Sequence, residues 1–101
     1  MQITISVRHG TLSEEAQAIV AAKVEKLSRL FDRLVGIEVT VDLECRDEPI
    51  VDLRVSAEHK HDFAASQRSN DLMGAVDLAV HKMEQQLRKY KQRIQQRHRS
   101  P

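Results

Sequence analysis

The chain has 101 residues, with sixteen basic and fifteen acidic side chains, one cysteine and three aromatic residues. This length predicts one small domain with a single core. One cysteine excludes an internal disulfide, no apolar run is long enough to span a membrane, and so few aromatic rings argue against stacking platforms as the main means of binding single strands.

The near-neutral total hides a strong charge asymmetry. The first eighty residues contain nine basic and fourteen acidic side chains, whereas the remainder has seven basic residues and a single acid, Glu84. A concentration of positive charge on an ordered domain attracts phosphate backbones by counterion release. The sequence therefore indicates a polyanion-binding C-terminal end. Because the N-terminus lacks the basic start and apolar stretch of a signal peptide, we expect a soluble cytoplasmic protein.

The first two elements are a strand and a helix. Ile3, Ile5 and Val7 alternate with polar residues, which is typical of a strand with one face on a core. Ser13 is an expected N-cap for a helix that runs to about Phe31, and Gly36 marks the exit. Its apolar residues fall on one arc of a helical wheel: Ile19, Val20, Val24, Leu27, Leu30, Phe31 and Leu34.

Three further strands follow. Residues 37–45 alternate between an apolar and an acidic face, and we expect Cys45, the single cysteine, to be a small core residue rather than a nucleophile. After a turn at residues 46–49, residues 51–57 alternate in the same way, and a shorter strand is expected around residues 63–66. Short connections predict an antiparallel meander.

The second helix begins near Asp71 and is the longest element. Its apolar arc comprises Leu72, Val76, Ala79, Met83, Leu87, Tyr90 and Ile94. The predicted fold class is α+β, with the order β-α-β-β-β-α: a two-layer sandwich in which two helices pack on one face of a four-stranded sheet. Residues 1–101 form a single domain, and the end of the basic helix is expected to fray after about residue 95. Acidic strand residues and basic helix residues should lie on opposite sides.

Basic residues form stripes beside both apolar arcs. Two such stripes on neighbouring helices predict a basic groove suited to the phosphates of structured RNA. The alternative is a solvated helix face, but the second helix lacks the acids that normally balance one. Arg88 and Arg99 point roughly away from the other basic residues of their helix. The stripes comprise Lys26, Arg29 and Arg33 on the first helix and Lys82, Lys89 and Arg93 on the second.

Lys23 and Tyr90 both fall within apolar arcs. We expect Lys23 to extend its ammonium to the edge of the core or to be paired, and either arrangement could direct it into the groove. Tyr90 is expected to be a core residue, with its hydroxyl reaching the edge, rather than a platform on which bases stack.

Other chemistry finds little support in the sequence. His59, His61 and Asp62 are metal-ligating residue types, but they fall in an expected polar turn. The chain has only three glycines, and they form no glycine-rich phosphate loop. Neither Cys45 with a histidine nor any set of Ser, His and Asp occurs in the context of a catalytic motif. We expect no metal, no cofactor and no enzymatic activity.

The second helix resembles a known signature. Residues 71–77 (DLMGAVD), Lys82-Met83 and residues 86–91 (QLRKYK) are similar to the second helix of the ribosome hibernation promoting factors and ribosome-associated translation inhibitors. The opening strand, residues 12–14 (LSE), Lys23, Lys26-Leu27 and residues 31–33 (FDR) also match comparable positions.

This resemblance implies a ribosome-binding protein of stressed or stationary-phase cells. It would occupy the messenger and transfer RNA channel of the small subunit, compete with both RNAs and silence translation. A ribosome modulation factor is a candidate partner. Without the dimerisation domain of long members, the chain resembles a short form, and the absence of an acidic extension favours a hibernation factor over an inhibitor. The implied contacts with ribosomal RNA are Lys23, Lys26, Lys82, Arg88, Lys89 and Lys91.

Two other functions remain compatible with the residues. A helix, three strands and a helix, as expected over most of this chain, also describe a double-stranded RNA-binding module, which reads duplex shape. A protein-interaction module could instead use the basic helix to recruit an acidic partner.

Overall fold

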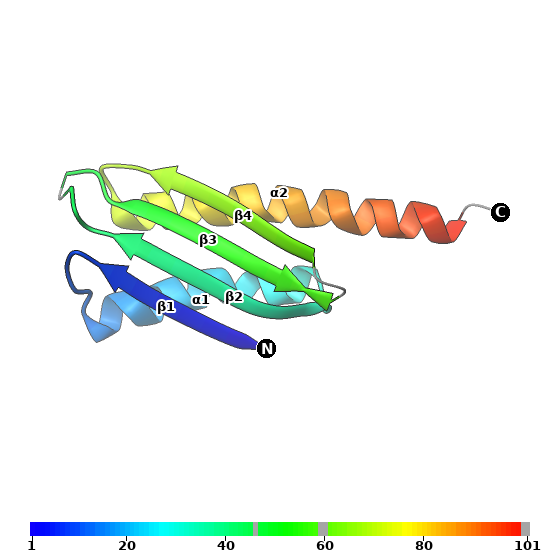
Figure 1. Cartoon of the computed structure of the whole chain (residues 1–101), viewed down its shortest axis with the longest axis horizontal. Helices are drawn as coiled ribbons and strands as arrows, with labels where there is room; N and C mark the ends of the chain where they lie inside the picture. The colour runs from blue at the N-terminus through cyan, green and yellow to red at the C-terminus, as the bar shows by residue number, and fades with distance from the viewer. Residues whose placement is uncertain (46, 59–60, 100–101) are drawn as a thin grey trace.

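A computed structural model of the chain contains four strands and two helices in the order expected from the sequence (Figure 1). It describes residues 1–45, 47–58 and 61–99, with side chains in the last helix up to residue 94. The expectations for Arg46, His59 and the side chains of Arg97 and Arg99 therefore lie outside the described residues. The elements are β1 (Gln2–Arg8), α1 (Glu14–Leu30), β2 (Leu34–Asp42), β3 (Ile50–Ala57), β4 (His61–Arg68) and α2 (Leu72–Arg99).

The strands form one mixed sheet in the order β1-β2-β3-β4. β2, β3 and β4 pair antiparallel, which confirms the predicted meander. β1 pairs parallel to β2, because α1 returns the chain to the end of the sheet where β1 began.

Both helices cover the same face of the sheet and leave the other face open, as predicted (Figure 1). The alternation of buried and exposed residues in β2 and β3 follows from this arrangement, because successive side chains point to opposite faces. Leu27 of α1 and Met83 and Leu87 of α2 are fully buried against Val39 and Leu53 of the central strands. The core thus lies between one sheet face and two parallel helices.

Side-chain caps define the starts of the two helices. Ser13 Oγ accepts a hydrogen bond from the Ala16 N–H at 3.1 Å, which confirms the predicted N-cap. Asp71 Oδ2 does the same for the Gly74 N–H at 3.2 Å. Each cap satisfies a backbone donor that has no partner within its helix.

The helix α1 ends close to the predicted position, but the segment that follows it differs from the prediction. The helix ends at Leu30, Phe31 is extended, and Leu34 already belongs to β2, so Gly36 lies within a strand. The pairing of β2 with β3 shifts register between Leu34 and Gly36. A bulge of this kind inserts one residue, which allows Leu34 and Ile37 both to face the core and explains why Leu34 also fitted a helical period.

The end of β2 also differs, and Cys45 is exposed rather than buried. The strand ends at Asp42, whose carboxylate accepts a hydrogen bond from the Glu44 N–H two residues later. This local turn competes with strand pairing, so the alternating pattern continues in the sequence after the strand has ended.

At its C-terminal end α2 extends past the sheet (Figure 1). Its 28 residues contribute to a longest molecular dimension of 54 Å, against 22 and 19 Å in the other directions. Among the described residues, no helix is both long and apolar enough to cross a bilayer.

Candidate nucleic-acid interface

One side of α2 lies along the edge strand β4. Lys82 Nζ donates a hydrogen bond to the Ser66 carbonyl at 3.4 Å, and Gln86 Nε2 donates to the Ala64 carbonyl at 2.8 Å. Lys89 and Arg93 follow Lys82 by seven and eleven residues, or about two and three helical turns, and therefore lie on the same side. We call Lys82, Lys89 and Arg93 the β4 flank.

The other side of α2 faces α1. Lys23 Nζ of α1 lies 2.7 Å from Asp77 Oδ1 of α2, which fixes the sides by which the two helices meet. Arg88 follows Asp77 by eleven residues and lies on that side, and Lys91 is three residues further on. We call Lys23, Lys26, Arg88 and Lys91 the inter-helix surface.

The predicted basic residues are therefore divided between two surfaces. The sequence predicted that the stripes of the two helices form one groove, but Lys82 lies against β4, on the side of α2 away from α1. A helical wheel gives the angle of a side chain about its own axis and does not show which neighbour occupies each side. Arg29, six residues after Lys23, lies about 120° around α1 and does not face α2. Apart from half-buried Lys23, the side chains are exposed: Lys26, Arg29, Lys82, Arg88, Lys89, Lys91 and Arg93.

Lys23 is paired, as one of the two predicted arrangements required. Its side chain is 26% exposed and that of Asp77 is 54% exposed, so solvent screens the pair and limits its contribution to stability to about 1 kcal/mol or less. The pair fixes the position of the ammonium but also places a carboxylate on the inter-helix surface. On the same helix, Arg88 Nη2 lies 4.0 Å from Oε2 of Glu84, which is one turn nearer the start of α2.

The open sheet face has mixed charge rather than the acidic charge expected. Glu38 lies opposite Arg54 in the register of β2 and β3, and Asp42 lies opposite Arg8 in that of β1 and β2. A hollow of about 410 Å³ lies on this face, and its lining includes Glu38 and Asp62 beside Arg54, so the acids outnumber the one basic side chain and disfavour phosphate. The described basic surfaces of the helices are therefore the better candidates for a polyanion.

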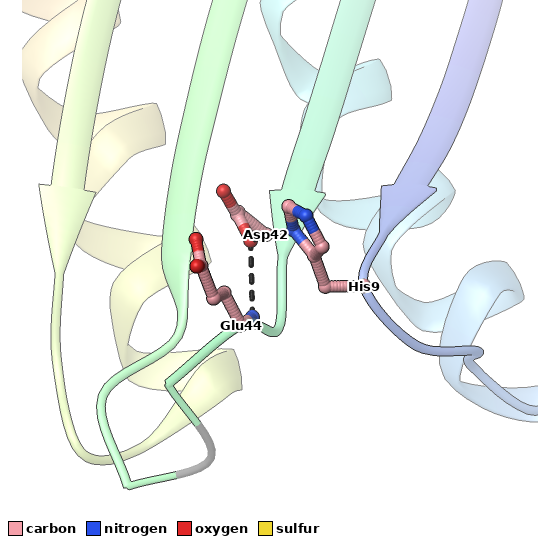
Figure 2. A network of polar contacts seen from close by, with 3 residues as sticks. All are labelled: His9, Asp42 and Glu44. Carbon is pink, nitrogen blue, oxygen red and sulfur yellow. Dashed lines mark hydrogen bonds and ion pairs between the residues drawn. The ribbon is translucent and has the colours of Figure 1, made fainter.

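The structure also assembles a polar cluster that sequence reasoning missed (Figure 2). Potential ligand atoms of His9, Asp42 and Glu44 lie within 4.8 Å of one another. Parallel pairing places Arg8 opposite Asp42 and so brings His9 close to Asp42, 33 positions later in the chain, which no local motif reveals. Asp42 Oδ1 accepts hydrogen bonds from His9 Nδ1 at 2.9 Å and from the Glu44 N–H at 3.0 Å, so the cluster fastens the ends of β1 and β2.

These contacts predict an acid-dependent contribution of Asp42 to stability. The hydrogen bond from His9, followed by that from the Glu44 N–H, holds the pKa of the Asp42 carboxyl below its ordinary value of 3.8. Because the folded-state pKa is lowered, the stabilisation is present above pH 3.8 and is lost as the pH falls through the folded-state pKa. We expect Asp42→Asn to reduce the free energy of unfolding above this range and to converge with the unmodified protein below it.

Urea unfolding at a series of pH values measures this difference. Asp52→Asn, which removes one carboxylate from the open face of β3, is the matched control and should not reproduce the convergence. A gap between the Asp42 variant and the unmodified protein that stays constant down to the lowest pH would contradict the role of this carboxylate.

Comparisons with known proteins agree with this fold. Residues 3–95 match the family described as Sigma 54 modulation protein / S30EA ribosomal protein. The chain is 29% identical over 94 residues to a ribosome hibernation promoting factor of Azotobacter vinelandii, covering 92% of this chain and 85% of that protein. It is 30% identical over 89 residues to a ribosome hibernation promotion factor of Bacillus subtilis, covering 79% of this chain but only 43% of that longer protein.

A solved structure shares the architecture. A ribosomal subunit interface protein from Coxiella burnetii superimposes with a TM-score of 0.80 at 26% identity, covering 90% of this chain and 98% of that one. The match covers most of both chains and confirms the predicted fold class. The chain belongs to the Sigma 54 modulation protein / S30EA ribosomal protein family, which includes the ribosome hibernation promoting factors.

Proposed function

We propose that this protein binds the small ribosomal subunit through basic residues of both helices, occupies the path of messenger and transfer RNA, and thereby silences translation in hibernating ribosomes. The observation that supports this most directly is the position of the basic residues: all eight candidates lie on α1 and α2, on the side of the domain opposite the open sheet face. The two-helix layer can present both the inter-helix surface and the β4 flank to RNA.

The proposed contacts are electrostatic. Lysine and arginine side chains that neutralise phosphates release condensed counterions, so affinity falls steeply as salt rises. The inter-helix surface and the β4 flank border the two sides of α2, and together they could contact two neighbouring segments of ribosomal RNA. The proposed RNA-binding residues are Lys23, Lys26, Arg29, Lys82, Arg88, Lys89, Lys91 and Arg93.

The mechanism requires no cofactor. Exclusion is steric: a domain 54 Å long, seated in the RNA path, leaves no room for messenger or transfer RNA. Ribosomal RNA of the small subunit is the proposed partner, the cytoplasm is the proposed location, and a ribosome modulation factor is a further candidate partner. The Azotobacter and Bacillus relatives named for ribosome hibernation support this function.

Co-sedimentation with purified small subunits tests the proposal. We expect binding that falls steeply between about 50 and 200 mM salt and that is lost when transfer RNA already occupies the decoding region. Equal binding to empty and transfer-RNA-loaded subunits would overturn occupancy of the channel. Preference for free duplex RNA would instead favour a duplex-binding module, and binding that survives removal of all RNA would favour an acidic protein partner.

A further inference from the structure

The three aromatic residues of the chain gather at one end of the sandwich. Tyr90 of α2 lies with its ring centroid 5.6 Å from that of Phe31 and 5.3 Å from that of Phe63, at interplanar angles of 82° and 65°. The His61 ring of β4 is tilted by 51° at 4.8 Å. Edge-to-face contacts of this kind are favourable and hold the central ring in a defined orientation. Tyr90 is half-buried, as the sequence predicted for a residue at the margin of the core.

A hollow of about 260 Å³ opens beside this cluster. Among the residues that the structure describes, its lining consists of the rings of His61, Phe63 and Tyr90 together with Arg93 and Ile94, none of which carries a carboxylate. Phe31 lies behind Tyr90 and is 6% exposed, so it supports the site without lining it. In complexes with single-stranded RNA, unstacked bases stack on aromatic rings and on arginine guanidinium groups. The hollow offers both kinds of side chain.

The hollow adjoins the β4 flank. Contacts from Lys82 to Ser66 and from Gln86 to Ala64 show that α2 proceeds toward the start of β4 as its numbering rises. Continuing in this direction, Lys89 comes next and Arg93 reaches the hollow beside His61 and Phe63. A nucleic-acid backbone that follows the flank would therefore bring its bases to the aromatic hollow.

We propose that this hollow binds an unstacked base of a single-stranded RNA segment while Lys89 and Arg93 bind the flanking phosphates. The proposal rests on the proposed function and specifies the RNA that one part of the surface recognises. Charge complementarity favours RNA over an apolar peptide, because a peptide would use the rings but would leave the adjoining basic residues without a partner. The rings accept any base, so the site selects for single strands rather than for sequence.

Tyr90 itself provides the measurement. The chain has one tyrosine and no tryptophan, so the intrinsic ultraviolet emission of the intact protein reports this ring alone. The probes are an oligouridylate of about eight nucleotides and an abasic ribose-phosphate oligomer of equal length. We expect the oligouridylate to change the Tyr90 emission saturably and to bind about tenfold more tightly than the abasic oligomer. Equal affinities with unchanged emission would overturn the proposal.

A pair of histidine variants gives the matched comparison. His61→Ala removes an exposed ring from the hollow, whereas His81→Ala removes an exposed histidine elsewhere, on α2. We expect only His61→Ala to abolish the preference for the oligomer with bases, with affinity for the abasic oligomer unchanged in both. Loss of the preference in both variants, or in neither, would contradict the assignment.

The outcomes also separate this proposal from the ribosome proposal. Salt-dependent, transfer-RNA-sensitive subunit binding without any preference for bases would overturn the base site and leave the proposed function intact. A preference for bases without subunit binding would overturn the proposed function instead. If N-acetylphenylalanine amide changed the Tyr90 emission more strongly than the oligouridylate, the hollow would be a protein-docking site and the proposal would be wrong.

Discussion

Replacing Lys82 and Lys89 together with glutamine is expected to weaken binding to small ribosomal subunits by about 10- to 100-fold near 0.1 M salt. Both side chains are exposed on the β4 flank, two helical turns apart, where they can neutralise neighbouring phosphates. The slope of log affinity against log salt should also fall by about two, because each lost phosphate contact removes about one unit. Sedimentation across a salt series measures both quantities.

The matched control removes the same charge from the other side of the molecule. Arg8→Gln with Arg54→Gln takes two positive charges from the open sheet face. We expect this control to reduce affinity far less and to leave the salt slope almost unchanged. If the two double variants bind alike, net charge rather than the position of the flank decides affinity, and the proposed surface is wrong.

Leu27→Ala is expected to lower the free energy of unfolding by about 2–5 kcal/mol, a large part of the stability of a small domain. Leu27 is fully buried in the layer between α1 and the sheet. Its truncation removes apolar transfer energy and leaves a cavity that packed neighbours fill only partly. Urea unfolding with a shared slope for variant and unmodified protein gives the difference.

Leu78→Ala provides the comparison on the other helix. Leu78 is 47% exposed and belongs to α2, so the same chemical change should alter stability by about 0.5 kcal/mol or less. Similar losses in the two variants would show that the helices are not packed on the sheet as described. Where Leu27→Ala leaves part of the protein unfolded, its apparent subunit affinity should fall in proportion to the folded fraction.

The fold was largely predictable because its signals are local. Alternation at every second residue in β1, β2 and β3, and spacings of three and four in the helices, required no knowledge of neighbours. The errors occurred where two local signals competed. Leu34 fitted a helical arc and a bulged strand equally well, and the alternation up to Cys45 continued past the turn that the Asp42 side chain imposes.

The candidate interface was only partly predictable. The residues of the basic stripes were evident from charge and helical angle, but the partner of each side of α2 was not. The contact between Lys23 and Asp77 joins residues 54 positions apart, and that between Lys82 and Ser66 joins a helix to an edge strand. The cluster around Asp42 and the gathering of the aromatic rings around Tyr90 likewise depend on which strands and helices become neighbours.

The sequence by itself determined the element types, their order, most of the core residues and the concentration of positive charge on the second helix, although Cys45 and Ile19 proved exposed. Periodicity and charge are properties of neighbouring residues along the chain, so they can be determined without knowledge of the tertiary structure. Only the tertiary structure decided that the basic residues form two surfaces, that Lys23 is paired and that an aromatic hollow adjoins Arg93. Those features depend on the packing of side chains from distant segments, which the burial of a shared core establishes.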